Sequence, residues 1–70
     1  MTNQETPGET IARLRHAKGW SVYRLAIKAK VNRAQLGRIE RGERSMSFQT
    51  ALKIAAALGA SLAAFDGAKP

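Results

Sequence analysis

The sequence predicts a compact all-α domain of five helices. A helix start or stop signal bounds every segment of the chain, and the apolar residues recur at helical spacing. No run of alternating β-branched residues competes with this pattern. Seventy residues make one small domain, so we expect a single domain over residues 1–70 with its core at about 7–66.

The first helix is expected from Thr6 to about Lys18. Thr6 stands at the N-cap, with Pro7 at the first helical position and Glu9 at the third, which is the pattern of a capping box. Gly19 is placed to end the helix.

Two short helices follow almost without a gap. Ser21 is the expected N-cap of a helix that runs to about Ala29. Asn32 then caps the next helix, expected at 33–40, with Gln35 placed to complete a second capping box. Two short helices joined by about three residues indicate a helix-turn-helix at about 21–40.

The last two helices lie in the Ala-rich part of the chain. Ser47 is the expected N-cap of a helix at about 48–58, whose apolar residues keep the 3.6-residue period until Gly59. Ser61 begins the fifth predicted helix, in the stretch "SLAAFD".

Charge indicates the kind of partner. Twelve Lys and Arg against five Asp and Glu give a formal net charge of +7, which favours polyanions. Seven of the basic residues lie between positions 24 and 44. A solvated, solubilising face is the alternative interpretation.

Several classes of function are excluded by composition. The chain has no Cys for a disulfide or a thiolate zinc site, and His16 alone supports neither a metal cluster nor a catalytic relay. We therefore expect no enzyme, no cofactor, no metal and no small-molecule ligand. The polar start does not resemble a signal peptide, and the longest apolar run, 51–65, is shorter than the roughly 18 residues of a membrane span. A cytoplasmic protein is expected.

Small and apolar residues are placed to hold the second and third helices together: Leu25, Ala26, Ala29, Val31, Leu36 and Ile39. With these, the stretches "IARLRHAKGWS", "LAIKAKV", "LGRIERGER" and "FQTALKIAAALGASLAAF" resemble the lambda-repressor-like, or Cro-type (XRE), helix-turn-helix family over about residues 9–65. The resemblance implies a DNA-binding domain whose third helix enters the major groove. It also implies an ion pair between Arg15 and Glu40.

Two residues depart from the family pattern. Lys30 stands in the turn where the family usually has Gly, so either a left-handed lysine or a different turn is expected. Val22 replaces the usual Gln, which leaves its phosphate contact to backbone N–H groups, Tyr23 or Arg24.

The residues expected to read bases are Arg33, Ala34, Gln35, Gly37 and Arg38. Both arginines suit bidentate bonds to guanine, and Ala34 suits a thymine methyl group. Gln35 either reads adenine or only closes its capping box. Gly37 costs the helix roughly 1 kcal/mol against Ala, and we interpret it as a bare backbone that lets the helix approach the bases closely. A merely tolerated exposed Gly is the alternative.

Phosphate contacts are expected from residues around the third helix, which orient the protein without reading sequence. They are Tyr23, Arg24, Lys28, Asn32, Arg41, Arg44 and Ser45.

The sequence thus predicts a sequence-specific regulator of transcription, a repressor, bound to double-stranded DNA. An eight-residue helix contacts only a few base pairs, so we expect a homodimer on a pseudo-palindromic operator. Its interface is expected at Leu62, Ala63 and Phe65, apolar residues far from the DNA-facing side, with the start of the fourth helix as a further candidate. The alternative for Leu62 and Phe65 is a place in the protomer's own core.

Other settings stay open at this point. Phage-type repressor, restriction-modification controller and antitoxin are variants of one fold. A helix-turn-helix that binds protein is a further alternative. A basic amphipathic protein acting on anionic membranes is the rival from another class, although its cations cluster away from the Ala-rich fourth helix.

Overall fold

The computed structural model describes residues 5–65, without the side chains of Ala63 and Ala64. The regular structure of this part of the chain is entirely helical. Its elements are α1 (Pro7–Ala17), α2 (Val22–Ala29), α3 (Arg33–Glu40), α4 (Phe48–Leu58) and the 3-10 helix η1 (Leu62–Phe65). The all-α class is confirmed.

The fifth predicted helix is corrected by the structure. Leu62–Phe65 is a four-residue 3-10 helix, so the described residues form four α-helices and one tight turn. Gly59 ends α4 in a left-handed conformation, with φ of 70°. The short segment that follows takes the tighter i→i+3 pattern, which is common in short pieces of chain.

The N-terminal caps fall where the sequence predicts them. Thr6 and Glu9 form the complete capping box of α1, with reciprocal bonds of 2.9 and 3.1 Å. Ser21 and Ser47 cap α2 and α4. Each cap accepts a hydrogen bond from a backbone N–H that has no partner inside the helix.

The second capping box is only half formed. Asn32 Oδ1 accepts the backbone N–H of Gln35 at 3.0 Å. Within residues 5–65, the Gln35 side chain makes no return bond to the Asn32 backbone. Gln35 is therefore not held by the capping bond that the sequence suggested.

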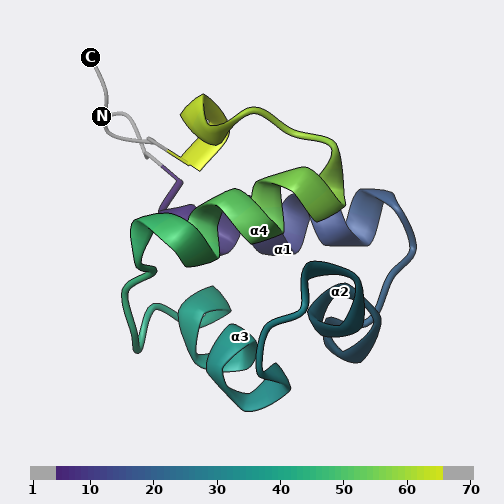
Figure 1. Ribbon diagram of the computed structural model, residues 1–70, viewed down its shortest axis with the longest axis horizontal. Helices are drawn as coiled ribbons and strands as arrows, with labels where there is room; N and C mark the ends of the chain where they lie inside the picture. The colour runs from purple at the N-terminus through teal and green to yellow at the C-terminus, as the bar shows by residue number, and fades with distance from the viewer. Residues whose placement is uncertain (1–4, 66–70) are drawn as a thin grey trace.

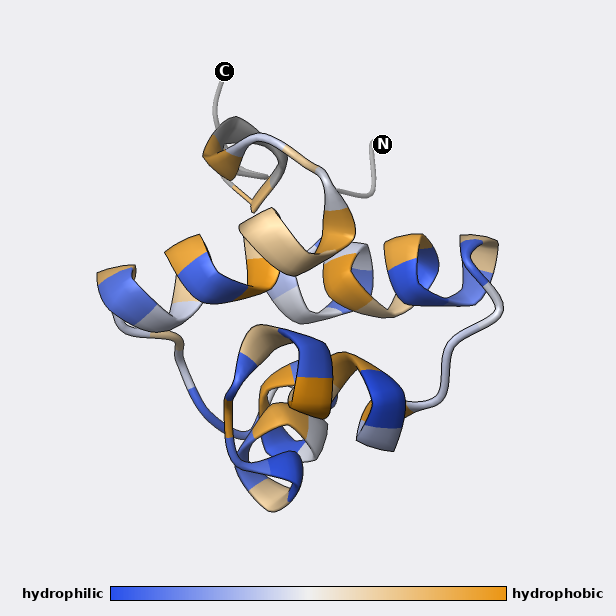
Figure 2. Cartoon of the chain, turned by 45° about the vertical axis from the view of Figure 1, so that its right-hand side comes forward, coloured by the Kyte–Doolittle hydropathy of each residue, from blue (hydrophilic) through white to orange (hydrophobic). Residues whose placement is uncertain are grey.

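The helices form layers around one core. Figure 1 shows α1 and α4 side by side, with α2 and α3 on one side of them and η1 on the other. In Figure 2, hydrophobic and hydrophilic residues alternate along the helices, as expected when each helix buries one face. The buried apolar residues are Ile11, Leu25, Ala26, Ala29, Leu36, Ile39, Ala51, Ile54, Ala55, Leu58 and Phe65.

The start of α1 lies directly on the end of α3. A Cβ atom added to Gly8 would collide with the carbonyl oxygen of Ile39 and lie 2.9 Å from that of Glu40. A side chain at this position would therefore separate the two backbones. This close approach is not evident from the sequence.

The residues expected at a dimer surface are placed differently from that prediction. Phe65 is only 7% exposed and belongs to the core, so its assignment to an exposed surface is wrong. Leu62 is half-buried and packs against the same core. The side chain of Ala63 lies outside the described residues. Phe65 is buried because η1 returns over α1 and α4, which local sequence does not reveal.

Candidate nucleic-acid interface

The turn between α2 and α3 has the left-handed residue that the family pattern requires, although that residue is a lysine. Lys30 has φ of 60° and ψ of 45°. Its N–H donates to the carbonyl of Ile27 at 3.2 Å, and the next N–H, from Val31, donates to Ala26 at 3.0 Å. Of the two alternatives for this position, the left-handed lysine is the one observed.

Helix α3 has one face in the core and the other in solvent. Leu36 and Ile39 are almost fully buried. The residues expected to read bases occupy exposed or half-exposed positions: Arg33, Ala34, Gln35, Gly37 and Arg38. A helix with this division has long basic side chains available for a groove of DNA.

Packing within the protein does not require a glycine at position 37. A Cβ atom added there would meet one neighbour, Nη1 of Arg41, at 3.3 Å. Because this atom ends a flexible exposed side chain, the protein itself has room for alanine. This leaves two explanations for the glycine, an external partner that approaches closely or simple tolerance.

Arg33 and Tyr23 contact each other across the helix-turn-helix. Cζ of Arg33 lies 5.2 Å from the centre of the Tyr23 ring. Tyr23 is the second residue of α2 and Arg33 the first of α3, so the contact joins the starts of the two helices. The spacing of the two residues in the sequence does not indicate that they meet.

Lys28 lies beside the turn that joins α1 to α2. Its ammonium is 5.0 Å from the centre of the Trp20 ring, and that of Lys18 is 5.3 Å from it. Trp20 itself is half-buried and packs against the core. The aromatic neighbour of Lys28 is thus Trp20, in the turn after α1, whereas that of Arg33 in α3 is Tyr23 of α2.

Arg41 is paired with an acid in the loop after α3. Its Nε and Nη2 donate to the Glu43 carboxylate at 3.0 and 3.4 Å. These bonds hold the pKa of Glu43 below its ordinary value and raise the pKa of Arg41. Both side chains are more than half exposed, so the pair is weak and open to exchange for another anion.

The remaining residues expected to contact phosphate are all exposed: Arg24, Asn32, Arg44 and Ser45. Asn32 already accepts the capping bond through its side-chain oxygen. Its side-chain NH₂ group is the part suited to a phosphate oxygen.

A bidentate ion pair joins α1 to the end of α3. Nε and Nη2 of Arg15 donate to the two Glu40 oxygens, each at 2.8 Å, and Nη1 donates to the Trp20 carbonyl at 2.9 Å. The side chains are 10% and 8% exposed. The bonds to Glu40 raise the pKa of Arg15 despite its burial. One guanidinium thus connects α1, the next turn and the helix with the basic outer face.

The described part of the chain has no group of three or more potential metal-ligating His, Cys, Asp or Glu side chains. None of its helices is long and apolar enough to cross a membrane. The rival membrane hypothesis drew on the apolar residues of α4, yet Ala51, Ile54 and Leu58 are buried in the core. They are not free to enter a lipid surface in this fold.

Two short helices, a left-handed turn and a basic outer face on the second helix define the class: a helix-turn-helix domain of the lambda-repressor-like (XRE) type. The helix-turn-helix domain family matches residues 8–66, and the chain belongs to it. This is a class of DNA-binding domains of transcriptional regulators and not of enzymes.

One similar protein is the HTH-type transcriptional regulator SutR of Escherichia coli (strain K12). It is 43% identical over 56 residues, which cover 80% of this chain and 32% of SutR. The chain thus spans about a third of the length of that relative.

Solved structures share the fold closely. The restriction-modification controller protein C.AhdI from Aeromonas hydrophila is 36% identical, with a TM-score of 0.81 over 84% of this chain and 89% of that one. The N-terminal DNA binding domain of SinR from Bacillus subtilis is 34% identical, with a TM-score of 0.84 over 90% and 93%. The clp gene regulator ClgR from C. glutamicum is 32% identical, with a TM-score of 0.77 over 84% and 77%.

Proposed function

We propose that this chain recognises a specific double-stranded DNA operator through the outer face of α3, placed in the major groove. The observation that carries the proposal is the division of α3, whose inner face is buried while its basic outer face is exposed. The Arg15–Glu40 pair, at 2.8 Å, holds this helix against α1. A fixed helix with free basic side chains suits direct readout of bases.

Chemistry assigns a role to each residue of the outer face. Arg33 and Arg38 suit bidentate bonds to guanine O6 and N7, and Ala34 suits a thymine methyl group. Gln35 suits adenine, and its side chain is not engaged by the capping bond expected from the sequence. Gly37 brings the backbone of α3 close to the base edges.

Affinity comes mainly from phosphate neutralisation in this proposal. The contacts are assigned to Tyr23, Arg24, Lys28, Asn32, Arg41, Arg44 and Ser45, all exposed. With about four to six basic contacts per protomer, the logarithm of affinity falls linearly with that of salt, by about 0.9 for each neutralised phosphate. When DNA binds, the Arg41 guanidinium releases the Glu43 carboxylate and contacts a phosphate instead.

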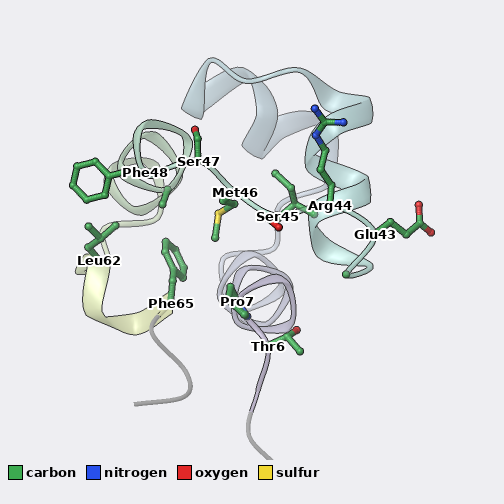
Figure 3. A pocket seen from close by; sticks show the side chains of 13 residues that line it. Thr6, Pro7, Glu43, Arg44, Ser45, Met46, Ser47, Phe48, Leu62 and Phe65 are labelled. Carbon is green, nitrogen blue, oxygen red and sulfur yellow. The ribbon is translucent and has the colours of Figure 1, made fainter. Parts of the chain in front are cut away.

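A second copy of the chain completes the operator complex. Phe48 is 68% exposed at the start of α4, and Leu52, one turn further on, is also exposed. Beside Phe48 lies an open hollow of about 830 Å³ whose apolar lining includes Met46, Leu62 and Phe65 (Figure 3). A two-fold axis lets Phe48 of each copy enter the hollow of the other. A surface with a protruding side chain next to a hollow is complementary to a second copy of itself.

This interface keeps Leu62 and the start of α4 from the surface expected from the sequence, and it includes the exposed Leu52. Phe65 is a core residue whose ring only lines the hollow. In the dimer, the two copies of α3 contact half-sites about 34 Å apart, one turn of DNA.

Repression by occupancy of the operator, in the cytoplasm, is the proposed mode of action. The named relatives include a transcriptional regulator, a restriction-modification controller and a gene regulator. A regulatory role is common to these names, while the biological setting differs among them.

The test uses an operator selected from a random duplex library with the wild-type protein. Arg38→Ala is expected to cost about 1–3 kcal/mol of binding and to relax preference at one base pair. Arg44→Ala is expected to weaken all sequences alike and to lower the salt slope by about 1. Equal binding of the wild type to selected and scrambled duplexes would contradict the proposal. Equal, sequence-independent losses in both variants would remove Arg38 from the base-reading set.

A further inference from the structure

Among the arginines of residues 5–65, Arg33 is the one whose guanidinium lies over an aromatic ring. Arg13, Arg15 and Arg41 are each bound by a carboxylate. Within residues 5–65, Arg33 makes no hydrogen bond or ion pair, and its neighbour is the Tyr23 ring, with Cζ 5.2 Å from the ring centre.

The difference matters for what the guanidinium is able to do. A carboxylate partner occupies N–H donors, as Glu43 does with Nε and Nη2 of Arg41. An aromatic ring attracts the cation without accepting conventional hydrogen bonds, so the five N–H donors stay available. The ring also restricts a long side chain before any partner binds, which reduces the entropy lost on binding.

We propose that Tyr23 positions Arg33 for base recognition, so that a residue of α2 helps to determine sequence specificity. The inference rests on the function proposed above and deepens it at one residue. It assigns Tyr23 a role through its ring. The role expected for Tyr23 from the sequence, a phosphate contact, would depend on its hydroxyl group.

Tyr23→Phe separates the two roles, because it keeps the ring and removes the hydroxyl. Tyr23 is 56% exposed, so neither Tyr23→Phe nor Tyr23→Ala is expected to disturb the fold. Arg38 provides a matched control within the same helix. None of the described aromatic rings has the Arg38 guanidinium over it, so its base pair should not respond to Tyr23.

The experiment measures binding of Tyr23→Phe, Tyr23→Ala, Arg33→Ala and the Tyr23→Ala/Arg33→Ala double variant to the selected operator and its single-base-pair variants. Tyr23→Ala is expected to lower affinity about two- to five-fold, the range of an exposed cation–π contact. It should relax preference at the base pair that Arg33→Ala relaxes and leave the Arg38 base pair unchanged. Tyr23→Phe should bind as the wild type does, and Tyr23→Ala should add no further loss in the Arg33→Ala background.

A loss in Tyr23→Phe equal to that in Tyr23→Ala would overturn the inference in favour of a phosphate contact. Independent, additive losses would overturn it as well. If Arg33→Ala relaxes one base pair and Tyr23→Ala does not, the inference fails while the proposed function stands. If the wild type does not distinguish operator from scrambled DNA, both fail.

A readout without DNA tests the geometry alone. In the free protein, the Tyr23 ring current should shift the Arg33 side-chain NMR resonances upfield. The shift should persist in Tyr23→Phe and vanish in Tyr23→Ala. Resonances unchanged by Tyr23→Ala would show that the ring does not hold Arg33, which would overturn the inference.

Discussion

At the scale of single residues, Gly8 and Gly37 occupy helices for different reasons. An added Cβ at Gly8 collides with the backbone of α3, whereas one at Gly37 meets only the flexible end of Arg41. The first glycine is required by the packing of the protein itself. The second is not, and its explanation lies outside the folded chain or in simple tolerance.

Gly37→Ala is expected to stabilise the fold by up to about 1 kcal/mol, because alanine has the higher helix propensity. The free energy of unfolding in denaturant measures this. If Gly37 serves close approach to the bases, affinity for the selected operator should fall in the same variant. Improved operator affinity would contradict the groove-fit hypothesis.

Gly8→Ala is expected to destabilise the fold by about 1–3 kcal/mol, the range of overpacking in a tight contact. The cause is the carbonyl oxygen of Ile39, a backbone atom that cannot turn away as a side chain does. Thermal and denaturant unfolding measure the loss, with Gly37→Ala as the same substitution at an open site. Unchanged stability would show that α1 and α3 separate easily at this point.

At the scale of elements, the turn between α2 and α3 carries a strained residue. Lys30 adopts the left-handed conformation, which costs an L-residue roughly 1–2 kcal/mol. Glycine avoids this strain but loses more backbone entropy on folding, about 0.5–1 kcal/mol. Lys30→Gly is therefore expected to raise the free energy of unfolding by about 0.5–1 kcal/mol.

The control for this prediction is Lys30→Ala, which removes the charge and keeps the Cβ atom. Denaturant unfolding of both variants separates backbone strain from charge. An equal gain in the two would assign the effect to charge.

The Arg15–Glu40 pair is the link between α1 and the end of α3. Glu40→Ala leaves the buried Arg15 guanidinium without its carboxylate, and we expect a loss of about 3 kcal/mol of stability. Denaturant unfolding measures it, and Glu43→Ala, which breaks the exposed pair with Arg41, serves as the control with little effect. Similar losses of stability in the two variants would show that the buried Arg15–Glu40 pair contributes no more than the exposed one.

At the scale of the whole molecule, the layers separate two surfaces. Helix α3 lies on one side of the α1–α4 layer and η1 on the other (Figure 1). The exposed apolar residues of α4 border the hollow that η1 helps to line (Figure 3). In the proposed dimer, this arrangement leaves the outer face of α3 free while a second copy occupies the hollow.

Phe48→Asp is expected to abolish dimerisation and cooperative operator binding, while stability changes by less than about 0.5 kcal/mol because Phe48 is largely exposed. Sedimentation at micromolar concentration and binding to one or two half-sites measure these effects. Phe65→Asp, by contrast, should unfold the protomer, because its ring is in the core. A monomeric wild type with full affinity for a single half-site would contradict the proposed dimer.

Much of the fold follows from interactions between residues close in the chain. The Thr6–Glu9 capping box and the caps at Ser21 and Ser47 join residues three apart. Gly19 and Gly59 end their helices in left-handed conformations. These signals are local, so the sequence alone predicts the four α-helices and, with them, the exposed basic face of α3.

One prediction failed because it depended on how distant segments meet. Phe65 is apolar near the end of the chain, and only the return of η1 over the core shows that its ring is buried. The same limit hides the pairing of Arg33 with Tyr23. Two other differences are local, because spacing does not fix a side-chain rotamer: Gln35 has the spacing of a capping box but does not close one, and Arg41 pairs with Glu43 two residues away.

The sequence by itself determined the four α-helices, their N-cap residues, the basic outer face of α3 and the family. It did so because helix periodicity and capping act over three or four residues. At this range, the separation of two residues along the chain fixes how they lie in space. The tertiary structure alone decided the backbone contact at Gly8, the hollow beside Phe48 and the contact of Arg33 with the Tyr23 ring. These depend on how the layers pack, which brings together residues that no local spacing relates.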